Sequence, residues 1–204
     1  RTNLPPDAPN QFLVNVLPDQ VEDAKATLSG RFGREIAFSP MVRGRLVELN
    51  GTPLDTTRFE DARARRLAER EFNLSWTDTL PGGNRVVGGR FWAPGARGEA
   101  EGMSLEDGIA ESLGVKLGDT LTFDIAGLRV TAKVTSLRKV DWDSFRVNFF
   151  ALFPPGPLDD KPASYIAAFK APETDNAWLA PLVQKHPNIL AIDVGELMRQ
   201  VQSI

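Results

Sequence analysis

The sequence contains no cysteine and only one histidine in 204 residues. A chain without cysteine can form no disulfide, no thiolate metal site and no cysteine nucleophile. The one histidine, His186, has no second histidine with which to bind a metal, and we interpret it as a solvated residue at the end of a helix. The lack of cysteine is compatible with an oxidising compartment and equally with the cytosol.

Long apolar runs are also missing. No stretch approaches the roughly 20 apolar residues that a helix needs to cross a bilayer. The chain begins at Arg1 without the apolar core of a signal peptide, and it ends at Ile204 inside a pattern that predicts a helix. We therefore expect a piece excised from a larger protein, with a processed or trimmed soluble protein as the alternative.

The sequence has no large excess of charge of either sign. Its net charge is −3, which gives no electrostatic reason to expect nucleic acid as a partner. The hydrophobic fraction of 42% is ordinary for a soluble globular protein, and 204 residues suffice for one or two domains with a substantial core.

The common catalytic and phosphate-binding motifs are absent as well. Gly82-Gly83 and Gly88-Gly89 come closest to a glycine-rich loop, and neither pair belongs to a GxGxxG or Walker A motif. The sequence contains no GxSxG nucleophile elbow and no HExxH zinc motif. We therefore expect no catalytic residue and no cofactor, and we predict that this chain is not an enzyme.

Alternating apolar residues and helix caps in the first 80 residues predict a β-α-β-α-β order, which favours a sheet backed by helices. The second of these helices is rich in arginine. Asp61 and Glu69 stand four residues before and after Arg65, the spacing of helical ion pairs, so we expect a solvated, ion-paired face. The expected strands lie at 12–16, 36–38, 42–49 and 74–80, and the expected helices at about 19–32 and 56–72.

Two segments that contain proline predict domain boundaries. They are Leu80-Pro81-Gly82-Gly83 and Ala171-Pro172. Short strands predominate between them. We therefore expect a discontinuous α/β subdomain, residues 1–80 and 172–204, interrupted by a β-rich subdomain, residues 81–171.

The centre of this insertion, from Ser104 to Val134, predicts a short helix, a turn and a β-hairpin. Ser104 is expected to cap the helix, and Gly114 to end it. Apolar and polar residues alternate from Thr120 to Ile125 as in a half-buried strand, and Ala126-Gly127 then reverses the chain.

The candidate functional residues stand in the segment Lys139 to Ser144. Asp141 and Asp143 could serve a metal-dependent enzyme, but the further ligands of a calcium loop are missing, and a turn with two solvated aspartates is the favoured interpretation. Trp142, in the same turn, is the one aromatic residue of this region that we expect to be exposed. We assign partner binding to Trp142 and Asp143.

The aromatic residues that follow Trp142 could suggest a stacking platform for single-stranded nucleic acid. Their alternation from Phe145 to Phe153 instead predicts a core strand that becomes buried on both sides.

Several segments together resemble the periplasmic domains of YbbP-like permeases, which belong to the MacB/LolC/FtsX superfamily of ABC-transporter permeases. The resemblance extends from about Pro5 to Ile204. The helix, turn and hairpin alone are a weak signal, and their combination with the other segments is more specific. The segments include NLSWTDTLP, EDGIAESLGVKLGDTLTFDIAG and SLRKVDWDSFRVNFFALFPPG.

The resemblance implies an α+β fold of the MacB-like type. Residues 1–80 and 172–204 would form its α/β porter subdomain, and residues 81–171 its β-rich sabre subdomain. The chain would be a periplasmic domain of an inner-membrane protein, anchored by membrane helices in the full-length protein.

The resemblance also implies a non-catalytic role. The domain would couple the ATP-driven motion of the membrane helices to a periplasmic partner or a lipid-like cargo. ATP would be hydrolysed by a separate cytoplasmic ABC ATPase subunit, and a lysophospholipase-type esterase is a further expected partner. Two other classes stay open: a soluble metal-dependent hydrolase that uses Asp141 and Asp143, and a stand-alone binding module that presents Trp142.

Overall fold

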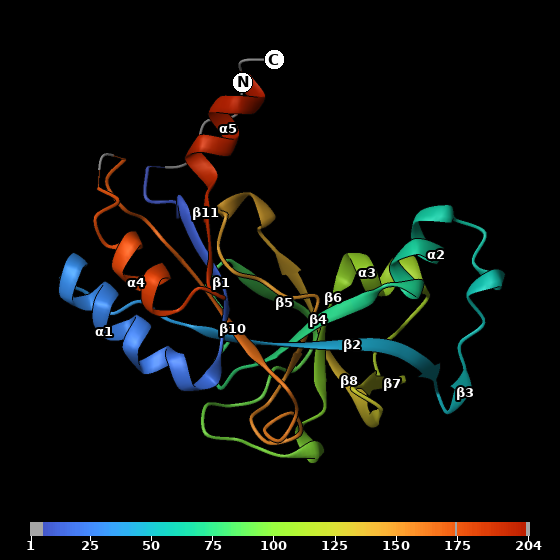
Figure 1. Cartoon of the computed structure of the whole chain (residues 1–204). Helices are drawn as coiled ribbons and strands as arrows, with labels where there is room; N and C mark the ends of the chain where they lie inside the picture. Colours follow the sequence, from blue (N-terminus) through green and yellow to red (C-terminus); the bar gives the residue numbers. More distant parts are fainter. Residues whose placement is uncertain (1–5, 174, 203–204) are drawn as a thin grey trace. The chain divides into compact units, whose positions relative to one another are not determined.

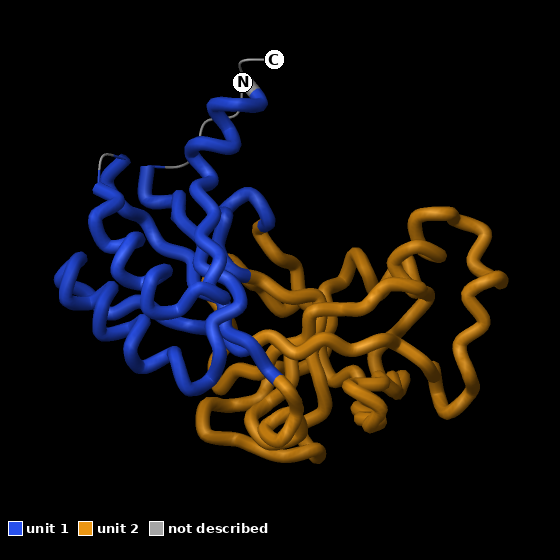
Figure 2. The backbone as a smooth tube through the Cα atoms, in the orientation of Figure 1, with its two compact units in different colours: residues 1–40, 142–147, 163–204 blue, residues 41–141, 148–162 orange. Residues whose placement is uncertain are grey.

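The computed structural model describes residues 6–173 and 175–202. Contacts divide the chain into two compact units, which Figure 2 shows in different colours. No helix in the described ranges is long and apolar enough to cross a membrane. The first unit consists of residues 1–40, 142–147 and 163–204, and the second of residues 41–141 and 148–162.

The first unit is a three-stranded antiparallel sheet with helices on one face (Figure 1). β1 (Gln11–Val16) lies between β10 (Ser164–Phe169) and β11 (Leu190–Asp193). α1 (Val21–Phe32) and α4 (Leu179–Lys185) share that face, because their apolar residues join those of the strands in one buried cluster. This cluster is the core of the first unit.

Residues next to these helices determine where the helices begin and end. A 3-10 turn, η1 (Pro18–Gln20), leads into α1, and Gly33 ends α1 with a φ of +67°. The helix expected over about 19–32 is therefore confirmed. Pro181 is the third residue of α4, a position where proline removes no helical hydrogen bond. A last helix, α5 (Val194–Gln202), follows β11 directly.

Six strands of the second unit pair in a closed ring. β4 pairs with β9 and β6 with β8 in parallel, and the other four pairings are antiparallel. In a closed ring every strand has a neighbour on both sides, so the ring has no edge strand at which another chain could pair and aggregate. Around the ring the order is β2 (Ser39–Leu49), β4 (Glu71–Trp76), β9 (Ala151–Phe153), β6 (Met103–Glu106), β8 (Leu128–Val140) and β7 (Thr120–Ile125), which returns to β2.

Shorter elements decorate this ring. β5 (Asn84–Gly89) extends the sheet beyond β8, and β3 (Thr52–Pro53) pairs with the end of β2. α2 (Ala62–Glu69) and α3 (Asp107–Leu113) contact each other, as Figure 1 shows. Three 3-10 turns complete the chain: η2 (Thr56–Arg58), η3 (Glu99–Glu101) and η4 (Trp142–Ser144).

Aromatic side chains form the core of the second unit. Phe123 and Phe153 are almost fully buried, with ring centroids 6.3 Å apart in an edge-to-face arrangement. Gly44 on β2 permits close packing, because a Cβ atom there would lie 2.7 Å from Cδ1 of Leu74.

The predicted hairpin is confirmed, whereas the predicted cap is wrong. β7 ends at Ile125 and β8 begins at Leu128, with positive φ at both Ala126 and Gly127, as in the tight turns that suit twisted strands. Ser104 lies within β6, and the carboxylate of Glu106 caps α3 by accepting the backbone N–H groups of residues 108 and 109 at 2.8 Å.

Ser104 is unavailable as a cap because it faces a buried arginine. Arg138 on β8 is fully buried and donates from Nε to Ser104 Oγ at 2.8 Å and from Nη1 to Asn84 Oδ1 at 2.6 Å. Its Nη2 donates to the carbonyls of Phe149 and Phe150, both at 3.0 Å. One guanidinium therefore joins β8 to β5, to β6 and to the segment before β9.

Arg138 remains charged at neutral pH. Burial lowers the pKa of its guanidinium to about 10, and the nearby carboxylate of Glu106 opposes the shift. No buried side-chain nitrogen or oxygen in the described part of the chain lacks a hydrogen-bond partner. The charge is thus accommodated by satisfying its donors rather than by neutralising it.

The strand predicted from Phe145 to Phe153 is wrong over most of its length. Only Ala151–Phe153 forms a strand, and Phe145 has a positive φ of 59°. The carbonyls of Phe149 and Phe150 both accept from Arg138, and the Phe150 carbonyl also accepts the backbone N–H of Glu106 on β6 at 2.8 Å. The segment before Ala151 is therefore irregular, with a left-handed residue at Phe145 and carbonyls that bind a buried guanidinium.

The compact units divide the chain at other positions than the expected boundaries after residues 80 and 171. Residues 41–80 join the second unit because β2 pairs with β4 and β7, and β4 pairs with β9. Pro81-Gly82 thus forms part of a loop between two strands of one unit. The division into 1–80, 81–171 and 172–204 stays a prediction about the family's subdomains.

We expect Arg138→Gln to lower the free energy of unfolding by about 3 kcal/mol or more, because the buried Phe149 carbonyl would lose its donor and the network to Ser104 and Asn84 would be broken. Urea unfolding would measure the change. The matched control is Lys139→Gln at the exposed neighbouring position, which should cost about 0.5 kcal/mol or less. Equal losses in the two variants would contradict a special role for the buried guanidinium.

Candidate functional site

The predicted partner-binding residues lie in η4, the turn that follows β8. Trp142 is 47% exposed, whereas Trp92 and Trp178 are 5% and 3% exposed. The expected exposure of Trp142 is therefore confirmed, and its role in binding a partner, with Asp143, stays a prediction.

The two aspartates of this segment, Asp141 and Asp143, do not form a metal site with other described residues. Asp141 is the last residue of segment 41–141 of the second unit, and it donates its backbone N–H to the Gly83 carbonyl at 2.8 Å. Asp143 belongs to the first unit. Within residues 6–173 and 175–202, no three His, Cys, Asp or Glu side chains lie close enough together to hold a metal ion. The alternative of a metal-dependent hydrolase thus finds no ligand set in this part of the chain.

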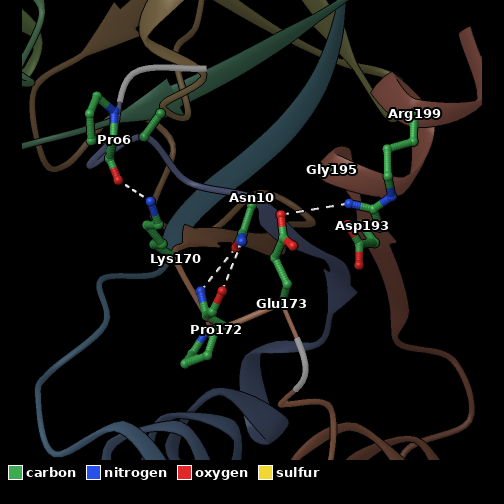
Figure 3. Close-up of a pocket in the computed structure, with 10 residues that line it drawn as sticks. Pro6, Asn10, Lys170, Pro172, Glu173, Asp193, Gly195 and Arg199 are labelled. Carbon is green, nitrogen blue, oxygen red and sulfur yellow. Dashed lines mark hydrogen bonds and ion pairs between the residues drawn. The ribbon is translucent and has the colours of Figure 1, made fainter. Parts of the chain in front are cut away.

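A pocket of about 400 Å³ lies in the first unit, where the chain enters β1, leaves β10 and begins α5 (Figure 3). Asn10 lines this pocket and connects the chain after β10 to the start of α5. The Asn10 side chain accepts the backbone N–H of Ala171 at 2.9 Å and donates to the carbonyl of the same residue at 2.8 Å. The Asn10 carbonyl accepts the N–H of Val194 at 2.8 Å, which fixes the start of α5.

Charges of both signs line this pocket, as Figure 3 shows. Arg199 lies 2.7 Å from the Glu196 carboxylate and 3.7 Å from that of Glu173. The hydrogen bond to Glu196 is the main reason that the pKa of Arg199 is raised. Lys170 donates to the Pro6 carbonyl, and Asp193 accepts the backbone N–H of Glu196 at 2.9 Å.

This arrangement can bind polar groups but offers no nucleophile with an adjacent base. The described lining contains no serine, threonine, cysteine or histidine. Gly195 in α5 borders the pocket, and a Cβ atom there would lie 3.3 Å from Asp193 Oδ1 and 3.5 Å from Arg199 Nη1, in contact with two side chains of the lining. The lining residues are Pro6, Ala8, Asn10, Lys170, Ala171, Pro172, Glu173, Asp193, Gly195 and Arg199.

Sequence reasoning missed this pocket. Asn10 and Ala171 are 161 residues apart, and no local motif connects an asparagine before one strand with a backbone amide after another. The proline at position 172 indicated only a boundary.

His186 lies at the end of a helix, as predicted, but it is not solvated. It caps the C-terminus of α4, and its side chain is only 14% exposed. Its Nε2 lies 2.6 Å from Oδ2 of Asp23 on α1, and Nζ of Lys185 lies 3.1 Å from Oδ1 of the same carboxylate. The hydrogen bond with His186, and then that from Lys185, lower the pKa of Asp23.

Comparison with known proteins connects the chain to a permease. The chain is 40% identical over 198 residues to YbbP of Escherichia coli (strain K12), an uncharacterized ABC transporter permease. The match covers 97% of this chain and 23% of YbbP, so the chain spans less than a quarter of the length of this relative. The resemblance to YbbP-like permeases drawn from the sequence is confirmed.

Other comparisons add little. No family model matches the sequence. Among solved structures, a domain assigned to a permease protein from Porphyromonas gingivalis matches with a TM-score of 0.40 and 8% identity, covering 94% of this chain and 90% of that one. Because this TM-score is low, only the match to YbbP bears on the family of the chain.

We expect Asp23→Asn to destabilise the chain more at pH 7 than at pH 3. The folded-state pKa of Asp23 lies below the ordinary value of 3.8, so its stabilisation is present above that value and is lost as the pH falls through the folded pKa. Thermal unfolding at both pH values would measure this difference. The matched control is Glu111→Gln on α3, which should show no such dependence. An Asp23→Asn effect of equal size at both pH values would contradict the assignment.

Proposed function

We propose that this chain is a periplasmic domain of an ABC-transporter permease subunit in the inner membrane. The observation that carries the proposal is the 40% identity to YbbP over 97% of the chain. The remainder of such a permease, more than three quarters of YbbP's length, would supply the membrane helices.

The porter and sabre subdomains of the family belong to this proposal. Residues 1–80 and 172–204 would form the porter and residues 81–171 the sabre. Two features support a discontinuous α/β part with a β-rich insertion. The first unit is a sheet backed by helices and is assembled from both ends of the chain, and the second unit is mostly strands from the middle.

The proposed role is non-catalytic coupling. A cytoplasmic ABC ATPase subunit would hydrolyse ATP, and this domain would pass the resulting motion to a periplasmic partner or a lipid-like cargo. The second unit suits such a role, because a closed ring of strands with a satisfied buried charge is a stiff body that can move as a whole. The pocket of the first unit, which offers no nucleophile, also favours binding over catalysis.

The absence of cysteine makes the periplasmic location testable. In a cysteine-free version of the full-length permease, Lys116→Cys would place a thiol at an exposed turn. We expect a membrane-impermeant maleimide to label it in intact spheroplasts. Ala151→Cys, at a buried position, is the matched control and should react only after denaturation. Labelling of Cys at position 116 only after lysis would place the domain on the cytoplasmic side.

We further propose that Trp142 and Asp143 contact the partner or cargo. An aromatic side chain that is half exposed beside a carboxylate has the composition of an interface anchor with a polar rim. Two probes represent the two expected partners: a fluorescent lysophospholipid for the lipid-like cargo, and an esterase of the lysophospholipase type.

We expect Trp142→Ala to weaken binding of one of these probes roughly tenfold, and Asp143→Asn to weaken it about threefold. Fluorescence anisotropy would measure the affinity, and the melting temperature should change by no more than about 2 °C. Leu128→Ala, at a 55% exposed apolar position at the start of β8, is the matched control. Unchanged affinity of Trp142→Ala for both probes would refute this contact.

A further inference from the structure

An ion pair in the lining of the first unit's pocket is too long for a hydrogen bond. Nη1 of Arg199 lies 3.7 Å from Oε1 of Glu173, and Figure 3 shows the two side chains pointing toward one another. The other ion pairs of the described residues measure 2.6 to 3.3 Å, so this pair is the longest of them. Its length distinguishes this pair from the other charged groups of the protein.

Both members of this pair have room for a further partner. The pair is the one interaction that Glu173 makes with described residues, and the Glu173 side chain is 78% exposed. Arg199 donates to Glu196 through Nη2 at 2.7 Å, and its Nη1 makes no hydrogen bond with the described part of the chain. Gly195 borders Nη1 without a side chain that could cover it, since a Cβ atom there would lie 3.5 Å away. A carboxylate and a guanidinium nitrogen are therefore accessible at the pocket.

The charges of the described lining are balanced. Lys170 and Arg199 supply two positive charges, and Glu173 and Asp193 supply two negative ones. A ligand that is only an anion would be repelled by both carboxylates and would take from Glu173 its one described partner. A ligand that is only a cation would be repelled by Lys170 and Arg199. A ligand with both charges avoids these costs, because it replaces one long ion pair by two short ones.

The rest of the lining limits the size of the ligand. The volume of about 400 Å³ is at the lower end of the range for small-molecule sites. The apolar residues of the described lining are all small, so they can contact a short hydrocarbon linker but cannot enclose a long acyl chain. They are Pro6, Ala8, Ala171 and Pro172.

We infer that this pocket binds a small zwitterion, whose ammonium group pairs with Glu173 and whose anionic group pairs with Arg199. Free amino acids and the phosphoethanolamine headgroup of a phospholipid share this chemistry. The inference rests on the lining of the pocket alone. Its failure would therefore leave the proposed transport function untouched, and the labelling of Lys116→Cys tests the location of the domain separately.

The test is isothermal titration calorimetry on the whole 204-residue chain with four probes. Glycerophosphoethanolamine and alanine carry both charges, glycerol 3-phosphate carries only the anion, and ethanolamine carries only the cation. We expect at least one zwitterion to bind with a Kd of about 1 mM or below, roughly tenfold more tightly than either probe of single charge. Tighter binding of glycerophosphoethanolamine would identify a lipid headgroup as the source of the ligand, and tighter binding of alanine a free amino acid.

Glu173→Gln separates recognition of the ligand from support of the fold. We expect this variant to weaken binding of the zwitterion roughly tenfold and to strengthen binding of glycerol 3-phosphate roughly threefold, because the repelling carboxylate is gone. A change that only disturbed the fold would weaken both. Arg199→Gln should weaken both probes, and Gly195→Leu should weaken the zwitterion although every charge of the lining remains.

The matched control is Glu22→Gln, which removes the same charge at an exposed position in the first turn of α1, outside the lining. It should change the affinity for each probe less than about twofold. Melting temperatures within about 2 °C of the wild type would verify that each variant is folded.

Three results would overturn the inference. One is no detectable binding of either zwitterion at about 20 mM. Another is binding of glycerol 3-phosphate as tight as that of the zwitterions, which would indicate a plain anion site. The third is equal weakening of the zwitterion by Glu22→Gln and Glu173→Gln, which would indicate diffuse electrostatic attraction.

Discussion

The buried guanidinium of Arg138 is the interaction on which most of the second unit depends. Removing a charged group from water costs several kcal/mol unless each of its donors finds an acceptor. Arg138 meets this condition with Ser104 on β6, Asn84 on β5 and the carbonyls of Phe149 and Phe150. These acceptors come from three separate parts of the chain, so the charge can be buried only when the strands have assembled in this order.

The same constraint explains where local rules fail. Ser104 has the identity of a helix cap, but its hydroxyl accepts from Arg138 and from Ser136, and Glu106 caps α3 in its place. The phenylalanines before β9 have the alternation of a strand, but the carbonyls of Phe149 and Phe150 accept from the guanidinium, and only the Phe150 carbonyl also pairs with β6. Competition for hydrogen-bond partners thus decides which residue caps α3.

The surface features fit a domain that binds and transmits rather than one that catalyses. The charged groups that line the pocket of the first unit have partners within the chain: Arg199 pairs with Glu196 and Glu173, Lys170 with a backbone carbonyl and Asp193 with a backbone N–H. Trp142, by contrast, is 47% exposed and offers a contact surface to other molecules. For a permease domain of the kind that we propose, such contacts would be the points where motion reaches a partner.

The sequence by itself determined the local elements and the likeness to YbbP. α1 and the turn at Ala126-Gly127 followed from caps, glycines and apolar periodicity, which act over a few residues. The candidate site was predicted only as far as the exposure of Trp142. The absence of any catalytic motif was likewise visible without coordinates.

Only the tertiary structure decided which distant groups meet. The partners of Arg138 lie 11 to 54 residues away, those of Asp23 and Asn10 more than 160. It also showed that the ion pairs expected for Arg65 on α2 are wrong, because Asp61 accepts from a backbone amide, Glu69 from the Thr56 hydroxyl, and Arg65 donates to the Phe59 carbonyl. Such pairings depend on desolvation and on which acceptors the assembled strands bring within 3 Å, and neither is encoded in the spacing of residues along the chain.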